Sequence, residues 1–156
     1  MMEREARARE LFLAGNNCAQ SVLMAFADVV GLTEEQAALV AVGFGGGMGR
    51  LRQNCGAYSA MVMVCGALSG ADGASSQRRE EVYARVQQVE RLFRETFGTI
   101  QCAELLRIPP KAQPPKPAER TTAYYDSRPC AAIVAGAARL LEELMLQTQE
   151  EQGCAR

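Results

Sequence analysis

The chain has 156 residues, of which 48% are hydrophobic and 22% charged, and its formal net charge is -1. This length predicts one domain with a sizeable core, and the near-neutral charge argues against a nucleic-acid partner, which would need a clustered basic face. The sequence contains no histidine, which excludes Ser-His-Asp and Cys-His catalytic pairs, HExxH zinc sites, two-histidine iron sites and CxxCH haem attachment. Because it contains six cysteines, thiol chemistry is the first function to consider.

The N-terminal part of the chain predicts three short helices. Residues 3–14 are rich in Ala, Arg, Glu and Leu, which favour helix. A second helix is expected over residues 18–31 and a third over residues 34–43. Gln36 follows Thr33 by three residues, which is the spacing of a capping box at the start of the third helix.

A glycine-rich loop, GFGGGMGRLRQN, covers residues 43–54 and precedes an apolar helix over residues 55–70. The loop lacks the GK[ST] of a P-loop and no strand precedes it, so a nucleotide loop is not expected. The polar segment ADGASSQ at residues 71–77 leads into an amphipathic helix over residues 77–97. A short helical turn is expected over residues 102–106.

Residues 108–117 hold five of the six prolines and both lysines, and they predict an extended crossing segment, because proline cannot continue a helix. The last helix is expected to have Ser127 as its cap and Pro129 in its first turn, and the polar tail over residues 148–156 is expected to fray. No segment shows the alternation of a strand. The sequence therefore predicts an all-α fold, a single-domain helical bundle of about five major helices over residues 1–156, with a glycine-rich loop and the proline-rich crossing.

The N-terminal sequence MMEREARARELFLAGN begins with alternating charges and lacks a long apolar stretch, so it is not a secretory signal. No run reaches the roughly 18–20 apolar residues of a membrane span. We expect a cytoplasmic, reducing location, in which several cysteines indicate metal binding or catalysis more often than disulfides. No two of them form a CxxC pair, which argues against a thioredoxin-type motif and a zinc knuckle.

Four of the cysteines fall at predicted helix starts: Cys18, Cys55, Cys102 and Cys130. Free backbone N–H groups and the helix dipole stabilise an anion there, so these thiols are expected to have a lowered pKa and to act as thiolates. Asn17 and Asn54 each precede one of the four and are expected to cap the helices. Cys65, about 15 Å further along its helix, is expected to be a buried core thiol, and Cys154 an exposed, non-functional one.

The segments GNNCAQSV, GFGGGMGR and CGAYSA, followed by two isolated cysteines, resemble the C_GCAxxG_C_C family over residues 11–144. That family is described as redox-active proteins with four cysteines and a CGAxxG motif. The resemblance selects the same four cysteines, and it implies a redox or metal role for them without naming a reaction. Ala60 stands where the motif has its last glycine, and a second copy of the pattern, CGALSG, begins at Cys65. The order of the segments assigns Cys55 to the motif.

The interpretation we favour is an iron–sulfur cluster or related metal centre on these four cysteines, with zinc as an alternative, for electron transfer to an unknown redox partner protein. Thiolates suit iron–sulfur clusters, zinc and Cu(I). Glycines would let backbone N–H groups approach the centre and arginines would offset its negative charge. The residues expected to line the site are Gly45, Gly46, Gly47, Arg50, Arg52 and Tyr58, although Tyr58 fits equally well as a packing aromatic.

Two alternatives use the same cysteines. One is metal-free thiol–disulfide redox chemistry, in which an activated thiolate attacks and a second cysteine resolves the intermediate. The other is a metal-binding accessory protein without turnover of its own. Whether the protein is an enzyme stays open at this point. The wide apolar stripes of the helix over residues 77–97 and of the last helix also fit a homodimer.

Overall fold

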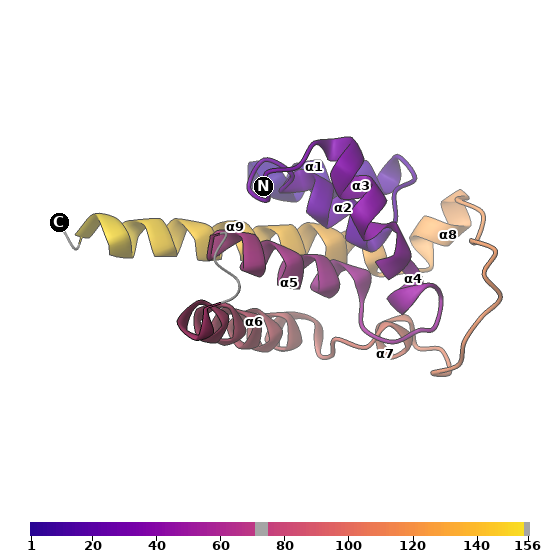
Figure 1. The fold of residues 1–156 in the computed structure, drawn as a ribbon. Coiled ribbons are helices and arrows are strands. Elements are labelled where there is room, and N and C mark those ends of the chain that lie inside the picture. Colours follow the sequence, from indigo (N-terminus) through magenta and orange to yellow (C-terminus); the bar gives the residue numbers. More distant parts are fainter. Residues whose placement is uncertain (71–74, 155–156) are drawn as a thin grey trace.

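The structure, a computed structural model, describes residues 1–70 and 75–154 (Figure 1). Over these residues the fold is all-α, as predicted, and no strand is present. The elements are α1 (Glu3–Leu13), α2 (Cys18–Ala25), α3 (Glu34–Ala41), the 3-10 turn η1 (Val42–Phe44), α4 (Gly45–Met48), α5 (Gly56–Leu68), α6 (Ser76–Phe97), α7 (Cys102–Leu106), α8 (Thr122–Asp126) and α9 (Cys130–Cys154). Part of the expected polar loop, residues 71–74, and the end of the tail, residues 155–156, lie outside the described residues.

Helix α9 forms the axis of the bundle (Figure 1). α1 and α2 pack along it on one side, α6 lies on the opposite side, and α5 contacts α2, α6 and α9. α4, α7 and α8 gather at the end of the bundle where α9 begins. Helix starts and loops are therefore concentrated at that end. The largest fully buried side chains of the core are Phe12, Phe26, Phe93, Leu23, Met61 and Leu141.

Side-chain caps fix the starts of two short helices. Thr33 and Gln36 form the predicted capping box, in which each side-chain oxygen accepts from the other residue's backbone N–H. Asn17 and Gln20 form the same arrangement before α2. Cys18 is thereby fixed as the first residue of α2.

Two helix ends differ from the prediction. α2 ends at Ala25, because the N–H groups of Phe26 and Ala27 donate to carbonyls only three residues back, which closes the helix in tight turns. α9 is longer than expected and continues to Cys154 through the tail that was predicted to fray.

Two predicted caps are wrong. The side-chain oxygen of Asn54 accepts from the amide of Gln101, 3.0 Å away, and Cys55 takes the N-cap position of α5. The hydroxyl of Ser127 donates to the carbonyl of Tyr124. Ser127 therefore ends α8, a helix that the sequence did not predict, instead of starting α9.

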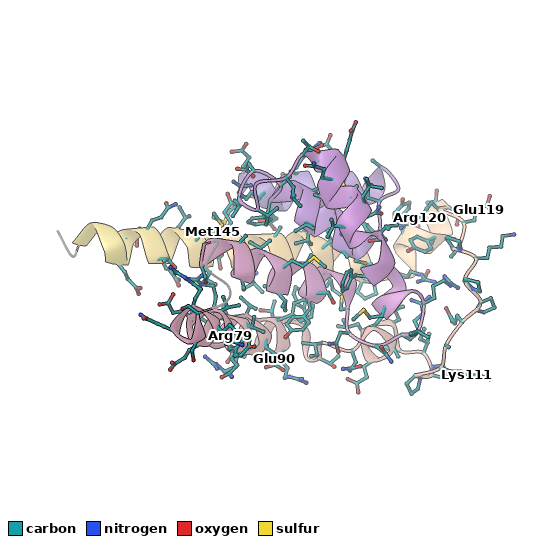
Figure 2. All side chains as sticks on the ribbon, in the orientation of Figure 1. Arg79, Glu90, Lys111, Glu119, Arg120 and Met145 are labelled. Carbon is teal, nitrogen blue, oxygen red and sulfur yellow. The ribbon has the colours of Figure 1, made fainter. Side chains whose placement is uncertain are left out.

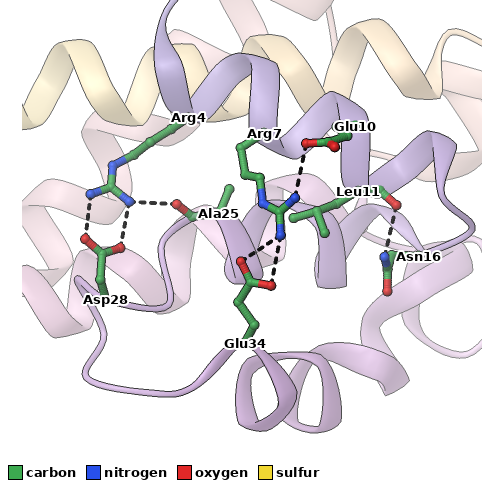
Figure 3. A network of polar contacts seen from close by, with 8 residues as sticks. All are labelled: Arg4, Arg7, Glu10, Leu11, Asn16, Ala25, Asp28 and Glu34. Carbon is green, nitrogen blue, oxygen red and sulfur yellow. Dashed lines mark hydrogen bonds and ion pairs between the residues drawn. The ribbon is translucent and has the colours of Figure 1, made fainter.

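Exposed ion pairs tie α1 to the segments that follow it (Figure 3). Arg4 donates to both carboxylate oxygens of Asp28 at 2.7 and 2.8 Å, and to the carbonyl of Ala25 at 2.7 Å. Arg7 binds both carboxylate oxygens of Glu34 at 2.9 Å. Because exposed pairs each contribute only about 0–1 kcal/mol, they orient these helices more than they stabilise them.

The proline-rich segment over residues 108–117 is irregular, as predicted, and crosses the end of the bundle from α7 to α8. Figure 2 shows Lys111 and Glu119 along this path and Arg120 beside α8. Among the described residues, no helix is both long enough and apolar enough to cross a membrane.

Candidate functional site

The structure brings four cysteines from four helices to one small cavity of about 40 Å³. Cys18, Cys102 and Cys130 are the first residues of α2, α7 and α9, and Cys55 is the N-cap of α5. The prediction that these thiols lie at helix starts is therefore confirmed. The complete lining is Cys18, Gly46, Gly47, Arg52, Cys55, Cys102, Leu105, Leu106, Tyr124, Arg128, Cys130 and Ile133.

Two backbone hydrogen bonds hold Cys55 beside Cys102. The N–H of Cys55 donates to the carbonyl of Ile100 at 2.7 Å, and the N–H of Cys102 donates to the carbonyl of Gln53 at 2.6 Å. The bonds flank an isolated antiparallel bridge between the two segments. This pairing positions α7, which at five residues is too short to be stable alone.

Gly56, the second residue of the CGA motif, lets α5 start close to α2. A Cβ at this position would lie 2.9 Å from the carbonyl oxygen of Phe44 and 3.0 Å from the backbone nitrogen of Ala19. Only glycine permits this approach without displacing backbone. Because Cys55 and Cys18 directly precede Gly56 and Ala19, the same approach brings their thiols to one cavity.

The glycine-rich loop forms a left-handed turn next to the cysteines. Residues 46–50 all have φ between 55° and 67°, and two of them, Met48 and Arg50, are not glycine. A left-handed residue other than glycine costs about 1–2 kcal/mol. Strain of this kind is typical of functional sites, where the surrounding structure holds it in place.

Arg52 places a cation against the thiol of Cys102. The arginine is only 4% exposed, and its Nη1 lies 3.5 Å from Sγ of Cys102. Its Nε and Nη2 donate to the side-chain oxygen of Gln113, at 3.0 and 2.6 Å. Gln113 belongs to the crossing segment, so that segment helps to hold the arginine in the site.

Three of the six residues predicted to line the site do so, namely Gly46, Gly47 and Arg52. The other three do not, and each has a local reason. Tyr58 packs edge-on against Phe93 of α6, with ring centroids 5.7 Å apart.

Gly45 and Arg50 border the loop on a different side. A side chain at Gly45 would overlap the amide of Asn17. Arg50 extends toward the crossing segment, where its Nε donates to the carbonyl of Pro114 at 2.7 Å. Both residues line a neighbouring cavity instead of the cysteine cavity.

The thiols of Cys18 and Cys130 interact with each other and have opposite pKa shifts. The interaction with Cys18, and then the positive charges of Arg128, Arg120 and Arg52, lower the pKa of Cys130 to about 7 in spite of its burial. The same interaction and burial raise the pKa of Cys18 well above its usual value. Cys130 is therefore the more acidic thiol of this pair.

Burial is the largest influence on the pKa of Cys55. It raises the pKa of this thiol to about 12, although the N–H groups of Ala57 and Tyr58 act in the opposite direction. The expectation that every helix start lowers a thiol pKa is therefore wrong for Cys55 and Cys18. For Cys55 the reason is that desolvation of a buried anion exceeds the stabilisation that a helix start provides. For Cys18 the interaction with Cys130 is the larger cause, and burial adds to it.

Cys65 has the core position that the sequence predicted. It is fully buried in α5, outside the cysteine cavity, and burial raises its pKa to about 11. It is the natural internal control for the four clustered thiols. The side chain of Cys154 lies outside the described residues.

Sequence reasoning missed two polar residues of the cavity wall, Tyr124 and Arg128. Both precede Cys130 closely in the chain, and the guanidinium of Arg128 stacks over the ring of Tyr124 at 4.5 Å. A basic residue two positions before a cysteine was the available signal for Arg128. Tyr124 gave none, because α8 itself was not predicted.

This combination of a glycine loop, a CGA helix start and two later isolated cysteines decides the family. The model of the family described as "Putative redox-active protein (C_GCAxxG_C_C)" matches residues 16–144. The chain belongs to this family. No curated protein and no solved structure matches the chain. Ala60, at the position of the motif's last glycine, is fully buried in α5.

The four cysteine thiols are suitable ligands for a metal centre, because soft metals and iron–sulfur clusters prefer sulfur ligands. The geometry is not that of a preformed cage. Within residues 1–70 and 75–154, no group of three or more cysteine or carboxylate side chains is arranged to hold a metal ion. A cavity of about 40 Å³ accommodates roughly one water-sized group. The thiols would have to rearrange around a larger centre.

Proposed function

We propose that this C_GCAxxG_C_C protein is a small electron-transfer protein whose Cys18, Cys55, Cys102 and Cys130 bind an iron–sulfur cluster or a related thiolate metal centre. The observation that carries the proposal is the convergence of four free thiols from four helix starts on one cavity. The four cysteines are far apart in the sequence, so only the folded chain brings them to one cavity. The other side chains that line the cavity are harder metal ligands than thiolates or do not bind metals.

The chain's own residues favour negative charge at this place. Cys130 lies at the N-terminus of α9, a helix of 25 residues, where backbone N–H groups and the helix dipole stabilise a thiolate. Arg52 and Arg128 add positive charge at the wall. A bound iron–sulfur cluster would supply one-electron chemistry, and these groups would tune its potential.

The test is metal and sulfide analysis of protein produced anaerobically with ample iron. We expect stoichiometric iron with a visible absorption spectrum, and loss of most of the iron in each serine variant of Cys18, Cys55, Cys102 and Cys130. The matched control is Cys65→Ser, which removes a buried thiol outside the cavity and should retain the iron. A colourless, metal-free wild-type protein under these conditions would contradict the proposal.

A second candidate, thiol–disulfide exchange, is favoured by the interaction between Cys18 and Cys130. The Cys130 thiolate would attack a disulfide of a partner protein and release one partner thiolate. The Cys18 thiol, after losing its proton, would then attack the mixed disulfide, forming a Cys18–Cys130 disulfide and releasing the reduced partner. Peptide mapping after incubation with oxidised glutathione tests this. Recovery of both cysteines as free thiols or glutathione adducts would rule it out.

A further inference from the structure

We propose that a second cavity, adjoining the cysteine site, binds a small molecule that carries carboxylate or phosphate groups. The cavity has a volume of about 300 Å³ and is walled by the glycine-rich loop, the end of the crossing segment and α8. The residues that would contact the anion are Arg50, Arg52, Arg120 and Arg128. This inference goes beyond the proposed metal or disulfide chemistry and does not depend on it.

The positive charge of this cavity is not neutralised by carboxylates. Arg50 and Arg52 donate to neutral acceptors, namely the side-chain oxygen of Gln113 and the carbonyl of Pro114, and Arg52 also to a thiol. Among the described residues, none of the four arginines forms an ion pair, and no Asp or Glu lines the cavity.

Arg120 has an unsatisfied donor in this region. Its Nη1 is buried and has no hydrogen-bond partner among the described residues, whereas its Nη2 donates to the carbonyl of Asn16 at 3.2 Å. Its guanidinium lies 4.8 Å from the ring centre of Phe12 and 4.7 Å from that of Tyr124, so the rings fix its position. A buried donor without a partner is destabilising, and because Arg120 also lines the cavity, an anion bound there would place negative charge beside this guanidinium.

The guanidinium of Arg128 is fixed by stacking, but its positive charge is not neutralised. It stacks over Tyr124 at 4.5 Å, and within the described part of the chain it has no hydrogen-bond acceptor. Burial, and then the charges of Arg52 and Arg128, lower the pKa of Arg50. The guanidinium groups are thus close enough to repel one another, and a bound anion would relieve this repulsion.

Size and shape favour a small organic anion over a single ion. About 300 Å³ is at the lower end of ordinary ligand pockets, and Gly45, Gly46 and Gly49 keep their part of the wall free of side chains. The planar fork of arginine matches the paired oxygens of a carboxylate or phosphate. Four residues, Gly46, Arg52, Tyr124 and Arg128, line both cavities, so the ligand would lie beside the cysteines.

Calorimetric titration of the full chain with succinate, and separately with inorganic phosphate, tests the proposal and distinguishes the two kinds of anion. We expect saturable binding of at least one of them and none of the neutral diol 1,4-butanediol. Arg128→Gln and Arg120→Lys should each weaken binding at least about tenfold, the effect of losing one charge-assisted contact. Arg91→Gln on the exposed surface of α6 is the matched control and should leave binding unchanged.

The proposal is overturned if neither anion binds, or if Arg91→Gln weakens binding as much as the cavity variants, which would indicate non-specific attraction. Thermal unfolding of each variant checks that it is folded, and Arg128→Gln is the decisive variant because Arg128 makes only a stacking contact. Repeating the titration on Cys55→Ser separates the two proposals. That variant should lose the metal and keep the anion.

Discussion

Gly47 stands directly against Cys102: a Cβ at position 47 would lie 2.6 Å from the Cβ of Cys102 and 2.8 Å from the backbone nitrogen of Gln53. Gly47 also has a φ of 66°, in the left-handed region where glycine has no steric cost. The loop can therefore seat Cys102 in the cysteine cavity only because position 47 has no side chain.

Gly47→Ala should accordingly destabilise the protein and disturb the cysteine site. The left-handed backbone costs about 1–2 kcal/mol and the overlap with Cys102 about 1–3 kcal/mol more, so we expect the free energy of unfolding to fall by about 2–5 kcal/mol. Urea denaturation measures this fall, and metal content measured on the same variant shows whether Cys102 has been displaced.

Gly49→Ala separates the two causes. Gly49 has a φ of 55°, but the nearest atom to its Cβ position is the carbonyl oxygen of Gly43 at 3.9 Å. This variant should lose only the backbone contribution, about 1–2 kcal/mol, and keep its metal. Equal losses in the two variants would show that Gly47 is needed for its φ and not for its contact with Cys102.

Gln113 links the crossing segment to the arginine that faces Cys102. Its side-chain oxygen accepts from Nε and Nη2 of Arg52 and from Nη2 of Arg50. Gln113→Ala leaves the buried Arg52 without this acceptor, which costs about 1–3 kcal/mol. We expect a lower urea midpoint and faster tryptic cleavage after Lys111, which lies in the same segment.

The control for this prediction is Gln87→Ala, which removes the same side chain from the exposed surface of α6 and should change the stability by less than about 0.5 kcal/mol. If Gln113→Ala behaved like the control in both measurements, the crossing segment would be held by its backbone contacts alone.

The position of Cys18 at a helix start could be predicted from local chemistry, whereas Cys55 and Cys130 lie at helix starts although their predicted caps, Asn54 and Ser127, are wrong. Asn17 and Gln20 fix the start of α2 within a few residues of Cys18, and proline and glycine mark the boundaries of the later helices. The all-α fold follows from the same signals, because capping and helix-favouring residues act over one or two turns and need no information from distant parts of the chain.

The parts that failed depend on tertiary contacts. Tyr58 lies one turn after Cys55 in sequence, yet its direction is set by Phe93, which belongs to another helix. Burial, which raises the pKa of Cys55 to about 12, is also a property of the folded core and not of the helix start. The arginine cavity combines Arg50 with Arg120, residues far apart in the chain, so no local pattern reveals it.

Cys130 should be more reactive than Cys18 and Cys55 near neutral pH. With a pKa of about 7, half of it is thiolate at that pH, whereas Cys18 and Cys55, whose pKa values are raised, stay protonated. In a Cys154→Ser background, we expect the rate of alkylation of Cys130 by iodoacetamide to rise from pH 5.5 and to level off above about pH 8. Peptide mass spectrometry measures the rate at each cysteine.

Two variants check the cause of this reactivity. Arg128→Gln removes a charge that lowers the pKa of Cys130, so its plateau should move to higher pH. Cys65→Ser, which alters a thiol outside the cavity, should leave the profile unchanged. Faster alkylation of Cys18 than of Cys130 would show that the thiolate of the pair had been assigned to the wrong residue.

Metal affinity should rise with pH, because the ligands are thiolates and two of the thiols are protonated in the metal-free protein. Burial raises the pKa of Cys55 to about 12, and the pKa of Cys18 is also raised, so each thiol must lose a proton when it binds the metal. For each proton lost, the association constant increases about tenfold per pH unit as long as the pH is below the pKa of that thiol. Calorimetry with Zn²⁺ as the probe, in buffers of different ionisation enthalpy at pH 8, should therefore count at least two protons released. Cys55→Ser should release fewer and bind more weakly, whereas Cys65→Ser should match the wild type. Affinity that is independent of pH would mean that neither Cys18 nor Cys55 is a ligand.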